Sequence, residues 1–461
     1  MNEHNSQASR GSIAGKMILV GMIAFLCSIA AYLSYGIISE RKERLGIVEN
    51  SIAEEWGRSQ TIVGPVLSVP YRTSMRNEKG ELVSQEQILT ILPESFSLTT
   101  TIEPSERKRG IFTVPVYRAK VTGKAVFTPK DTVSFAETGV LIWERAVVGV
   151  AIADARSIDP QSSLVVNGIP QELDSGVGGS APFGVSQGIH APIPAQKWPL
   201  TIEFTTSVNG SQAVSFVPVG EVSEISVSSP WKTPSYMGAY LPTHSTLDSQ
   251  GFHASWSISA LGRGYPSVFA GNASASVSPV GYTEDWQKSS VAGGIPSTGS
   301  MEFGVRLFSG VDQYTQSERA VKYAILFIGL TFLTFFLFEV MGGRRLHPMQ
   351  YLFVGSALAL FYVLLIAFSE QVGFGRAYLM GAFMTTFLIA GYCRSVLGGG
   401  KRATLVGVVL ALSYCALYVI LRLEDYALLT GALLLFAVLT LAMFVTRKID
   451  WYAFDGGKRV N

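Results

Sequence analysis

Five charged side chains lie in or beside long apolar stretches of the sequence, where ionisable groups could support proton or ion chemistry. They are Glu339, Glu370, Arg422, Glu424 and Asp425. A buried carboxylate in a membrane helix is costly and usually paired, so such residues often mark a proton or ion path. All five, however, lie near the ends of their apolar stretches, and that position favours a structural role at helix ends.

The nearest opposite charges suggest the partners. We expect Glu339 to pair with Arg344 or Arg345, and Arg422 to pair with the two acids that follow it. The same charged turn could also pack against Glu370 or against the base of the large domain described below.

Other residue types that commonly carry chemistry are isolated. The histidines are His4, His190, His244, His253 and His347. No pair of them has the spacing of metal ligands, and the cysteines, Cys27, Cys393 and Cys415, all fall in apolar stretches. The glycine-rich segment 398–404 lacks the spacing of a phosphate-binding loop and is better explained as a basic turn between helices. We therefore predict a protein that is not an enzyme, with no catalytic, cofactor or metal site.

The composition is that of a membrane protein. Of the 461 residues, 48% are hydrophobic and only 15% are charged, against about 25% charged in a typical soluble protein. The net charge of +2 gives no reason to expect a nucleic-acid partner.

Six apolar stretches are long enough to be membrane helices. The first, Met17–Ile38, has 22 residues and as a helix would span about 33 Å. It is too long for a cleaved signal peptide and ends in charged residues, so we predict a retained signal anchor. Five more follow near the C-terminus, at 321–341, 349–368, 377–393, 404–421 and 426–445.

The basic residues of the connecting segments predict the orientation. Segments 342–348 and 394–402 and the tail after Thr446 each carry at least two arginines or lysines, whereas the alternate gaps carry one each. Basic loops stay in the cytoplasm, so both termini should be cytoplasmic and the large domain extracytoplasmic. The predicted divisions are a tail at 1–16, the anchor at 17–38, the domain at 39–320, a five-helix bundle at 321–445 and a tail at 446–461.

The large domain has the pattern of a β-protein. Short segments rich in Val, Ile, Thr and aromatic residues are separated by Gly and Pro, as in 252–260, where apolar and polar residues alternate. We predict an antiparallel β-rich, sandwich-like domain, preceded by a helical extension of the anchor over Leu45–Trp56. The glycine-rich segment 174–188 is predicted to be a long surface loop.

Several strings along nearly the whole chain resemble the CreD family of bacterial inner-membrane proteins. They lie at 52–71, 110–117, 188–192, 228–231, 317–323, 346–351, 368–370, 421–428 and 450–452. The resemblance implies an inner-membrane location, a periplasmic large domain and a role in cell envelope integrity and stress response, often linked to a two-component sensor and its response regulator. It implies no catalytic residues.

Two classes of function remain open. In the leading hypothesis the protein is not an enzyme, its periplasmic domain binds an envelope component or protein partner, and the helices anchor it in the lipid bilayer or signal. In the alternative, a transporter or lipid-handling protein uses the C-terminal helix bundle. Paired discontinuous helices or mid-bilayer polar residues would favour that alternative, and the sequence predicts neither. An enzyme within the β-rich domain ranks third, and the oligomeric state is left open.

Overall fold

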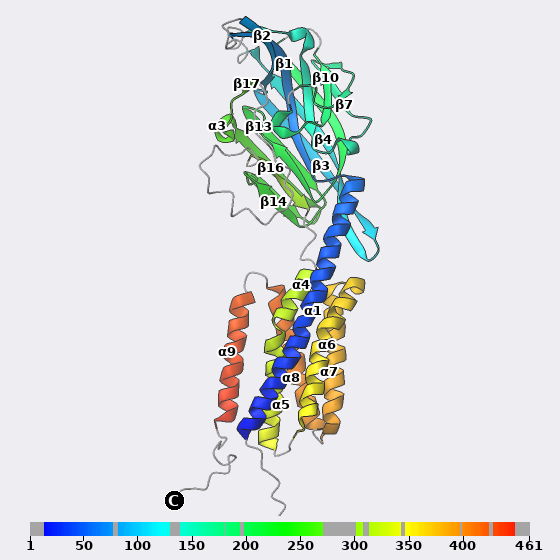
Figure 1. Cartoon of the computed structure of the whole chain (residues 1–461), viewed down its shortest axis with the longest axis vertical. Coiled ribbons are helices and arrows are strands. Elements are labelled where there is room, and N and C mark those ends of the chain that lie inside the picture. Colours follow the sequence, from blue (N-terminus) through cyan, green and yellow to red (C-terminus); the bar gives the residue numbers. More distant parts are fainter. Residues whose placement is uncertain are drawn as a thin grey trace, which may run out of the picture. The chain divides into compact units, whose positions relative to one another are not determined.

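The chain folds into two compact units. The computed structural model describes residues 13–76, 82–129, 139–179, 181–193, 198–270, 301–307, 313–342, 346–396, 399–423 and 427–447. One unit, here called the helix bundle, combines Met1–Leu45 with Val311–Asn461, and the other, the β-domain, is Gly46–Gly310. Figure 1 shows the helices of the first unit and the sheets of the second. The predicted N-terminal apolar helix, large β-rich domain and C-terminal apolar helices are confirmed.

The helices of the bundle follow the predicted apolar stretches. They are α1 (Ile13–Trp56), α4 (Gln313–Lys322), α5 (Ala324–Gly342), α6 (Pro348–Val372), α7 (Phe374–Val396), α8 (Gly400–Arg422) and α9 (Ala427–Thr446). Helices α1, α6, α7 and α8 are long and apolar enough to cross a membrane, and α4 with α5 provides a fifth span if the pair, bent by 45°, counts as one. The apolar part of α9, Leu429–Phe444, is shorter. A total of six spans therefore stays a prediction.

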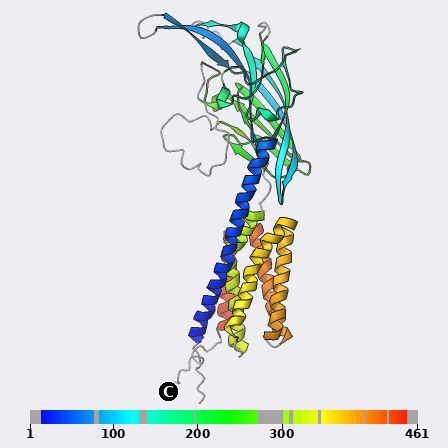
Figure 2. The same ribbon diagram turned by 45° about the vertical axis from the view of Figure 1, so that its right-hand side comes forward.

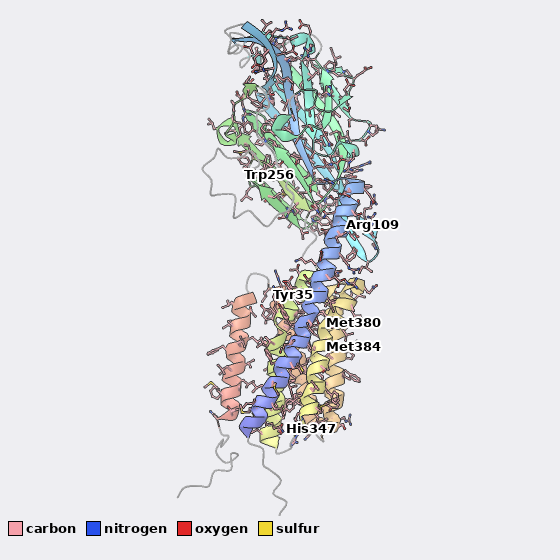
Figure 3. The ribbon with its side chains drawn as sticks, viewed as in Figure 1. Tyr35, Arg109, Trp256, His347, Met380 and Met384 are labelled. Carbon is pink, nitrogen blue, oxygen red and sulfur yellow. The ribbon has the colours of Figure 1, made fainter. Side chains whose placement is uncertain are left out.

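Local signals fix the ends of α6. His347 caps its first turn by accepting a hydrogen bond from the Met349 N–H, and the Gln350 side chain accepts one from the His347 N–H. Pro348 suits the first helical position because it has no N–H to leave unpaired. Figure 3 labels His347 at this end of the helix. At the other end Gly373 has a positive φ of 80°, which a residue with a side chain rarely adopts.

Small and aromatic residues pack the bundle. A Cβ atom on Gly355 of α6 would lie 2.4 Å from Cys27 Sγ of α1, so only glycine permits this close approach. Tyr378 of α7 donates a hydrogen bond of 2.7 Å to the carbonyl of Tyr414 in α8. On α7, Met380 and Met384 are exposed, as expected for a surface that faces lipid (Figure 3).

The β-domain contains two large sheets. The ten-stranded sheet runs in the order β14-β18-β12-β1-β6-β10-β9, with β2, β5 and β17 attached beside that path. Its strands are β1 (Gln60–Arg76), β2 (Leu82–Ile91), β5 (Val140–Leu141), β6 (Val147–Ile152), β9 (Asp174–Ser175), β10 (Gly188–Pro192), β12 (Ala213–Val217), β14 (Pro234–Gly238), β17 (Val268–Ala270) and β18 (Phe303–Leu307).

The second sheet has eight strands in the order β15-β16-β13-β3-β4-β11-β7-β8. They are β3 (Ser95–Arg109), β4 (Phe112–Phe127), β7 (Ser163–Val166), β8 (Ile169–Pro170), β11 (Leu200–Ser211), β13 (Val222–Ser229), β15 (His244–Asp248) and β16 (Gly251–Ser259). Strands β3 and β4 form one long hairpin, which projects beyond the rest of the sheet in Figure 2.

Most neighbouring strands are antiparallel, as predicted, but two pairings are parallel. Strand β1 pairs with β12, and β3 pairs with β13, in the parallel sense. Each pair joins strands separated by more than a hundred residues, and such long connections allow the chain to return in the same direction. The prediction of an antiparallel β-rich domain therefore holds for most pairings but not for these two.

One hydrophobic core joins the two sheets. Trp256 of β16 lies with its ring centroid 5.5 Å from that of Phe303 of β18, and both side chains are fully buried (Figure 3). The alternation predicted for residues 252–260 is confirmed, since Phe252, Ala254, Trp256 and Ile258 are buried and the residues between them are exposed or half-buried.

The glycine-rich segment 174–188 is mostly irregular, as predicted, but only part of it is exposed. It begins with β9 and contains the short 3₁₀-helix η4 (Pro182–Gly184). Val177, Phe183 and Val185 within it are buried in the core. Its glycines allow close approach, since a Cβ atom on Gly178 would lie 2.3 Å from the ring of His190. Because Gly178 and Gly184 are exposed, the segment is a surface loop that is held in place by its buried apolar side chains.

The helical extension predicted over Leu45–Trp56 is confirmed as the last part of α1, and its end packs within the β-domain. Its Trp56 Nε1 donates to the carbonyl of Tyr117 at 3.3 Å, and the Arg107 guanidinium lies 4.0 Å from the Trp56 ring centroid. Arg109 at the hairpin tip, labelled in Figure 3, forms an ion pair of 2.7 Å with Glu55. The helix ends at Gly57, where a Cβ atom would meet the Asn209 carbonyl at 2.5 Å.

Candidate functional site

Glu339 lies at the centre of a polar cluster at the end of α5. Its carboxylate forms an ion pair with Lys16 of α1 and accepts hydrogen bonds from the Tyr351 hydroxyl at 3.0 Å and the Leu346 N–H at 3.2 Å. Lys16 also donates to the Leu346 carbonyl at 2.9 Å. The expected partners Arg344 and Arg345 lie outside the described residues. These interactions join α1, α5 and α6 at the end of α5, so Glu339 can hold the three helices together.

Glu370 takes part in a second cluster, which joins α1, α4 and α6. Its carboxylate lies 3.5 Å from the Nε of Arg41 and 3.3 Å from the hydroxyl of Tyr314. Nearby on α4, Glu318 forms ion pairs with Lys322 at 2.8 Å and with Lys42 at 3.9 Å.

The Tyr35 hydroxyl also donates to Glu318, at 3.4 Å, and Figure 3 labels Tyr35 on α1. The sequence does not single out Glu318. The signal that could have found it is its i, i+4 spacing from Lys322 in the short helix before the apolar stretch.

Arg422 ends α8 and interacts with Tyr418, one turn earlier on the same helix. Its Nε and Nη2 atoms donate to the Tyr418 hydroxyl at 3.2 and 2.9 Å, and its guanidinium lies 5.4 Å from the Tyr418 ring centroid. Glu424 and Asp425 lie outside the described residues. The three predicted charges that the structure describes, Glu339, Glu370 and Arg422, each have separate partners.

A small enclosed cavity of about 10 Å³ lies within the bundle. Its lining includes the side chains of Thr331, Tyr362, Ser413 and Tyr414. That volume is about what one water molecule needs, so in this conformation the cavity is far too small for a transported solute. The sequence did not predict these polar residues or the bend between α4 and α5, and both are features that would favour a transporter.

The β-domain has a buried polar cluster where α1 ends. Gln60 is fully buried and donates through Nε2 to the Asn209 carbonyl at 2.7 Å, while its Oε1 accepts from the Asp154 N–H at 3.2 Å. The Arg156 guanidinium donates to both oxygens of Asp154, and these bonds hold the pKa of that carboxyl below its usual value. Its full set of partners marks this cluster as structural.

Glu302 lies directly before β18, and its carboxylate is buried without an ion pair or hydrogen bond to offset the loss of water within the described residues. Only 2% of its surface is exposed, and neither carboxylate oxygen has a hydrogen bond of standard geometry within the described residues. Burial raises the pKa of this carboxyl to about 7, and the nearby Thr61 side chain only partly opposes the shift. A buried carboxyl of this kind is an ionisable group near neutral pH. The sequence gives no sign of it, because the flanking pattern is that of an ordinary strand.

Three of the described histidines each have their own surroundings. His190 Nδ1 lies 3.2 Å from the Gly176 carbonyl, His347 caps α6, and His253 is exposed on β16. Among the described residues, no three or more His, Cys, Asp or Glu side chains are grouped so that they could hold a metal ion.

Apolar N- and C-terminal helices with a β-rich domain between them define a multi-pass integral membrane protein. The family model described as "Inner membrane protein CreD" matches residues 12–452. The chain is 32% identical over 425 residues to the "Inner membrane protein CreD" of Escherichia coli strain K12, a match that covers 91% of this chain and 89% of that relative. The chain therefore belongs to the CreD family of inner membrane proteins.

Proposed function

We propose that the protein supports the integrity of the cell envelope without catalysing a reaction. In this proposal the β-domain lies in the periplasm and binds an envelope component, and the helix bundle anchors it. The observation that carries the proposal is the insertion of a large β-domain between the first and the later apolar helices of an inner membrane protein. The basic segments 342–348 and 394–402 and the basic C-terminal tail support a periplasmic side for that domain.

The two polar clusters of the bundle fit an anchoring role. The Glu339 cluster fastens the start of α1 to α5 and α6, and the cluster around Glu318 and Glu370 fastens α1 to α4 and α6 further along the same helix. Because α1 continues into the β-domain, this double attachment would hold the helix that carries the domain.

The transporter or lipid-handling alternative rests on the 45° bend between α4 and α5 and on the hydroxyl groups around the small cavity. The bend lies at the start of an apolar stretch, whereas discontinuous helices that build transport sites are usually broken near mid-membrane and occur in pairs. We therefore keep anchoring as the leading proposal and transport as the alternative.

A crosslinking pull-down from intact membranes tests the proposal. Membrane-impermeant crosslinker should join the β-domain to an envelope component, and deletion of the gene should weaken the envelope. If crosslinks form only with cytoplasmic proteins, the proposal is wrong. Substitution of Thr331 and Ser413 by alanine should leave the envelope phenotype intact, whereas a transporter that uses these groups would lose it.

A further inference from the structure

The solvent-facing side of the eight-stranded sheet carries a continuous row of hydroxyl side chains across six neighbouring strands. The strand registers place these residues opposite one another, in the order Ser255, Ser226, Thr99, Thr122, Thr205 and Ser163. Each of these residues is exposed or half-buried. Along their strands they alternate with buried apolar residues such as Leu98 and Phe204. Six strands at the usual spacing make the row about 24 Å long.

Four of the six row residues line a shallow depression of the sheet surface. An open depression of about 330 Å³ is lined by Thr99, Thr122, Ser163 and Thr205 from the row and by Lys124 and Glu203 beside it. Neighbouring hydroxyls are close enough to share a partner, since the Ser226 and Thr99 oxygens lie 3.3 Å apart.

The charges on this face are balanced. Lys124 and Glu203 form an ion pair of 2.8 Å, and Arg118 lies opposite Glu103 in the next strand. A strongly anionic polymer such as a nucleic acid would require an excess of basic residues. The face therefore suits a ligand that carries many hydrogen-bonding groups and little net charge.

We propose that this hydroxyl row binds an extended glycan strand of the cell wall. Serine and threonine hydroxyls both donate and accept hydrogen bonds, as do the hydroxyl and amide groups of a polysaccharide of amino sugars. The spacing of β-strands is close to the length of one sugar ring, so successive rings of a linear glycan would meet successive strands. The inference rests on the proposed periplasmic position and names the envelope component of the proposed function.

Two features distinguish a glycan from other occupants. A peptide added to a sheet pairs with an exposed strand edge, whereas the row runs across the face of the sheet. A lipid surface would need exposed large apolar side chains beside the row, and most of the residues that line the depression carry a hydroxyl or a charge.

Binding can be measured with the full-length protein in lipid nanodiscs. The probes are soluble, uncrosslinked glycan strands released from purified cell walls, and chitohexaose, a linear oligomer of the same amino-sugar class. Maltohexaose, whose linkage gives a curved chain, is the comparison ligand. Both linear glycans should bind more tightly than maltohexaose. Absence of binding by both linear glycans would overturn the inference.

Variants of two row residues make the test specific. Joint replacement Thr122→Val and Thr205→Val keeps side-chain shape and strand preference but removes two hydroxyls, so affinity should fall about tenfold or more. Thr122→Ser with Thr205→Ser keeps the hydroxyls and should bind like the wild type. Thr113→Val, on the same strand as Thr122 but outside the row, is the matched control. Equal binding by the valine and serine pairs would refute the assignment.

Failure of this inference can be told apart from failure of the proposed function. A protein crosslinked to the β-domain, together with no glycan binding in nanodiscs, would overturn the glycan assignment and leave envelope binding intact. Loss of every envelope crosslink from the β-domain would overturn both.

Discussion

Replacement of Glu302 by glutamine should change how the stability of the β-domain depends on pH. The carboxyl is buried beside β18, with no hydrogen bond of standard geometry to either oxygen within the described residues. Glutamine has nearly the same shape but cannot ionise. Any constant effect of the amide is the same at every pH, so the difference between two pH values isolates the ionisation of Glu302.

The expected size follows from the pKa. Burial raises the pKa of Glu302 from 4.5 to about 7. Because one pKa unit corresponds to about 1.4 kcal/mol, ionising the carboxyl costs about 3 kcal/mol more in the folded domain than in the unfolded chain. Between pH 4.5 and pH 7 the folded state binds more protons than the unfolded state. The free energy of unfolding of the wild type should therefore fall as pH rises through this window, and Glu302→Gln should remove that fall.

Tryptophan fluorescence during denaturant unfolding of the full-length protein in detergent provides the assay. Six of the seven tryptophans, 56, 143, 198, 231, 256 and 286, lie in the β-domain segment, so the signal reports chiefly on it. Between pH 5 and pH 8 the free energy of unfolding of Glu302→Gln should rise by about 2–3 kcal/mol relative to that of the wild type. Glu94→Gln, at an exposed position, is the control and should parallel the wild type. Parallel curves for Glu302→Gln and the wild type would refute the argument.

Four further predictions concern topology, the bundle and the cysteines. A reporter enzyme fused after Gly210 should be active only outside the cytoplasm, and one fused at Gly399 only inside; a cytoplasmic signal from Gly210 would overturn the orientation. Glu339→Gln should lower the membrane-protein level in immunoblots, since Lys16 would lose its charged partner, whereas normal levels would show that the cluster is dispensable. Arg422→Ala should lower the level only slightly, because an exposed interaction contributes about 0–1 kcal/mol, and Arg422→Lys should restore it in part. Reductant should leave the fluorescence melting curve unchanged, because residues 46–310 contain no cysteine; a shift would point to an unexpected crosslink.

The membrane helices could be predicted because hydropathy over twenty residues is a local property. Their polar partners could not, since Lys16 and Glu339 are 323 residues apart in sequence and meet only after the bundle has packed. The expected partners of Glu339 were the nearest basic residues, Arg344 and Arg345, which lie outside the described residues, and the structure adds the distant Lys16. Arg422 is the opposite case, since its partner Tyr418 is one helical turn away and could have been found from i, i+4 spacing.

Strand segments in the β-domain were also predictable, but sheet order and register were not. The alternation around Trp256 marks one buried face from sequence alone. The hydroxyl row needs five separate strand registers, including the parallel pairing of β3 with β13, which no local pattern specifies. The glycines of segment 174–188 indicated a loop, but the close approach of Gly178 to His190 is visible only in three dimensions.

Site-specific photocrosslinking in intact cells tests the central claim that the β-domain binds an envelope component. A photoreactive amino acid at position 122, in the hydroxyl row, should yield an adduct with a component of the cell envelope after illumination, and the same group at position 113 should yield much less. Adducts with cytoplasmic proteins, or no adduct at position 122 in a correctly inserted protein, would contradict the account.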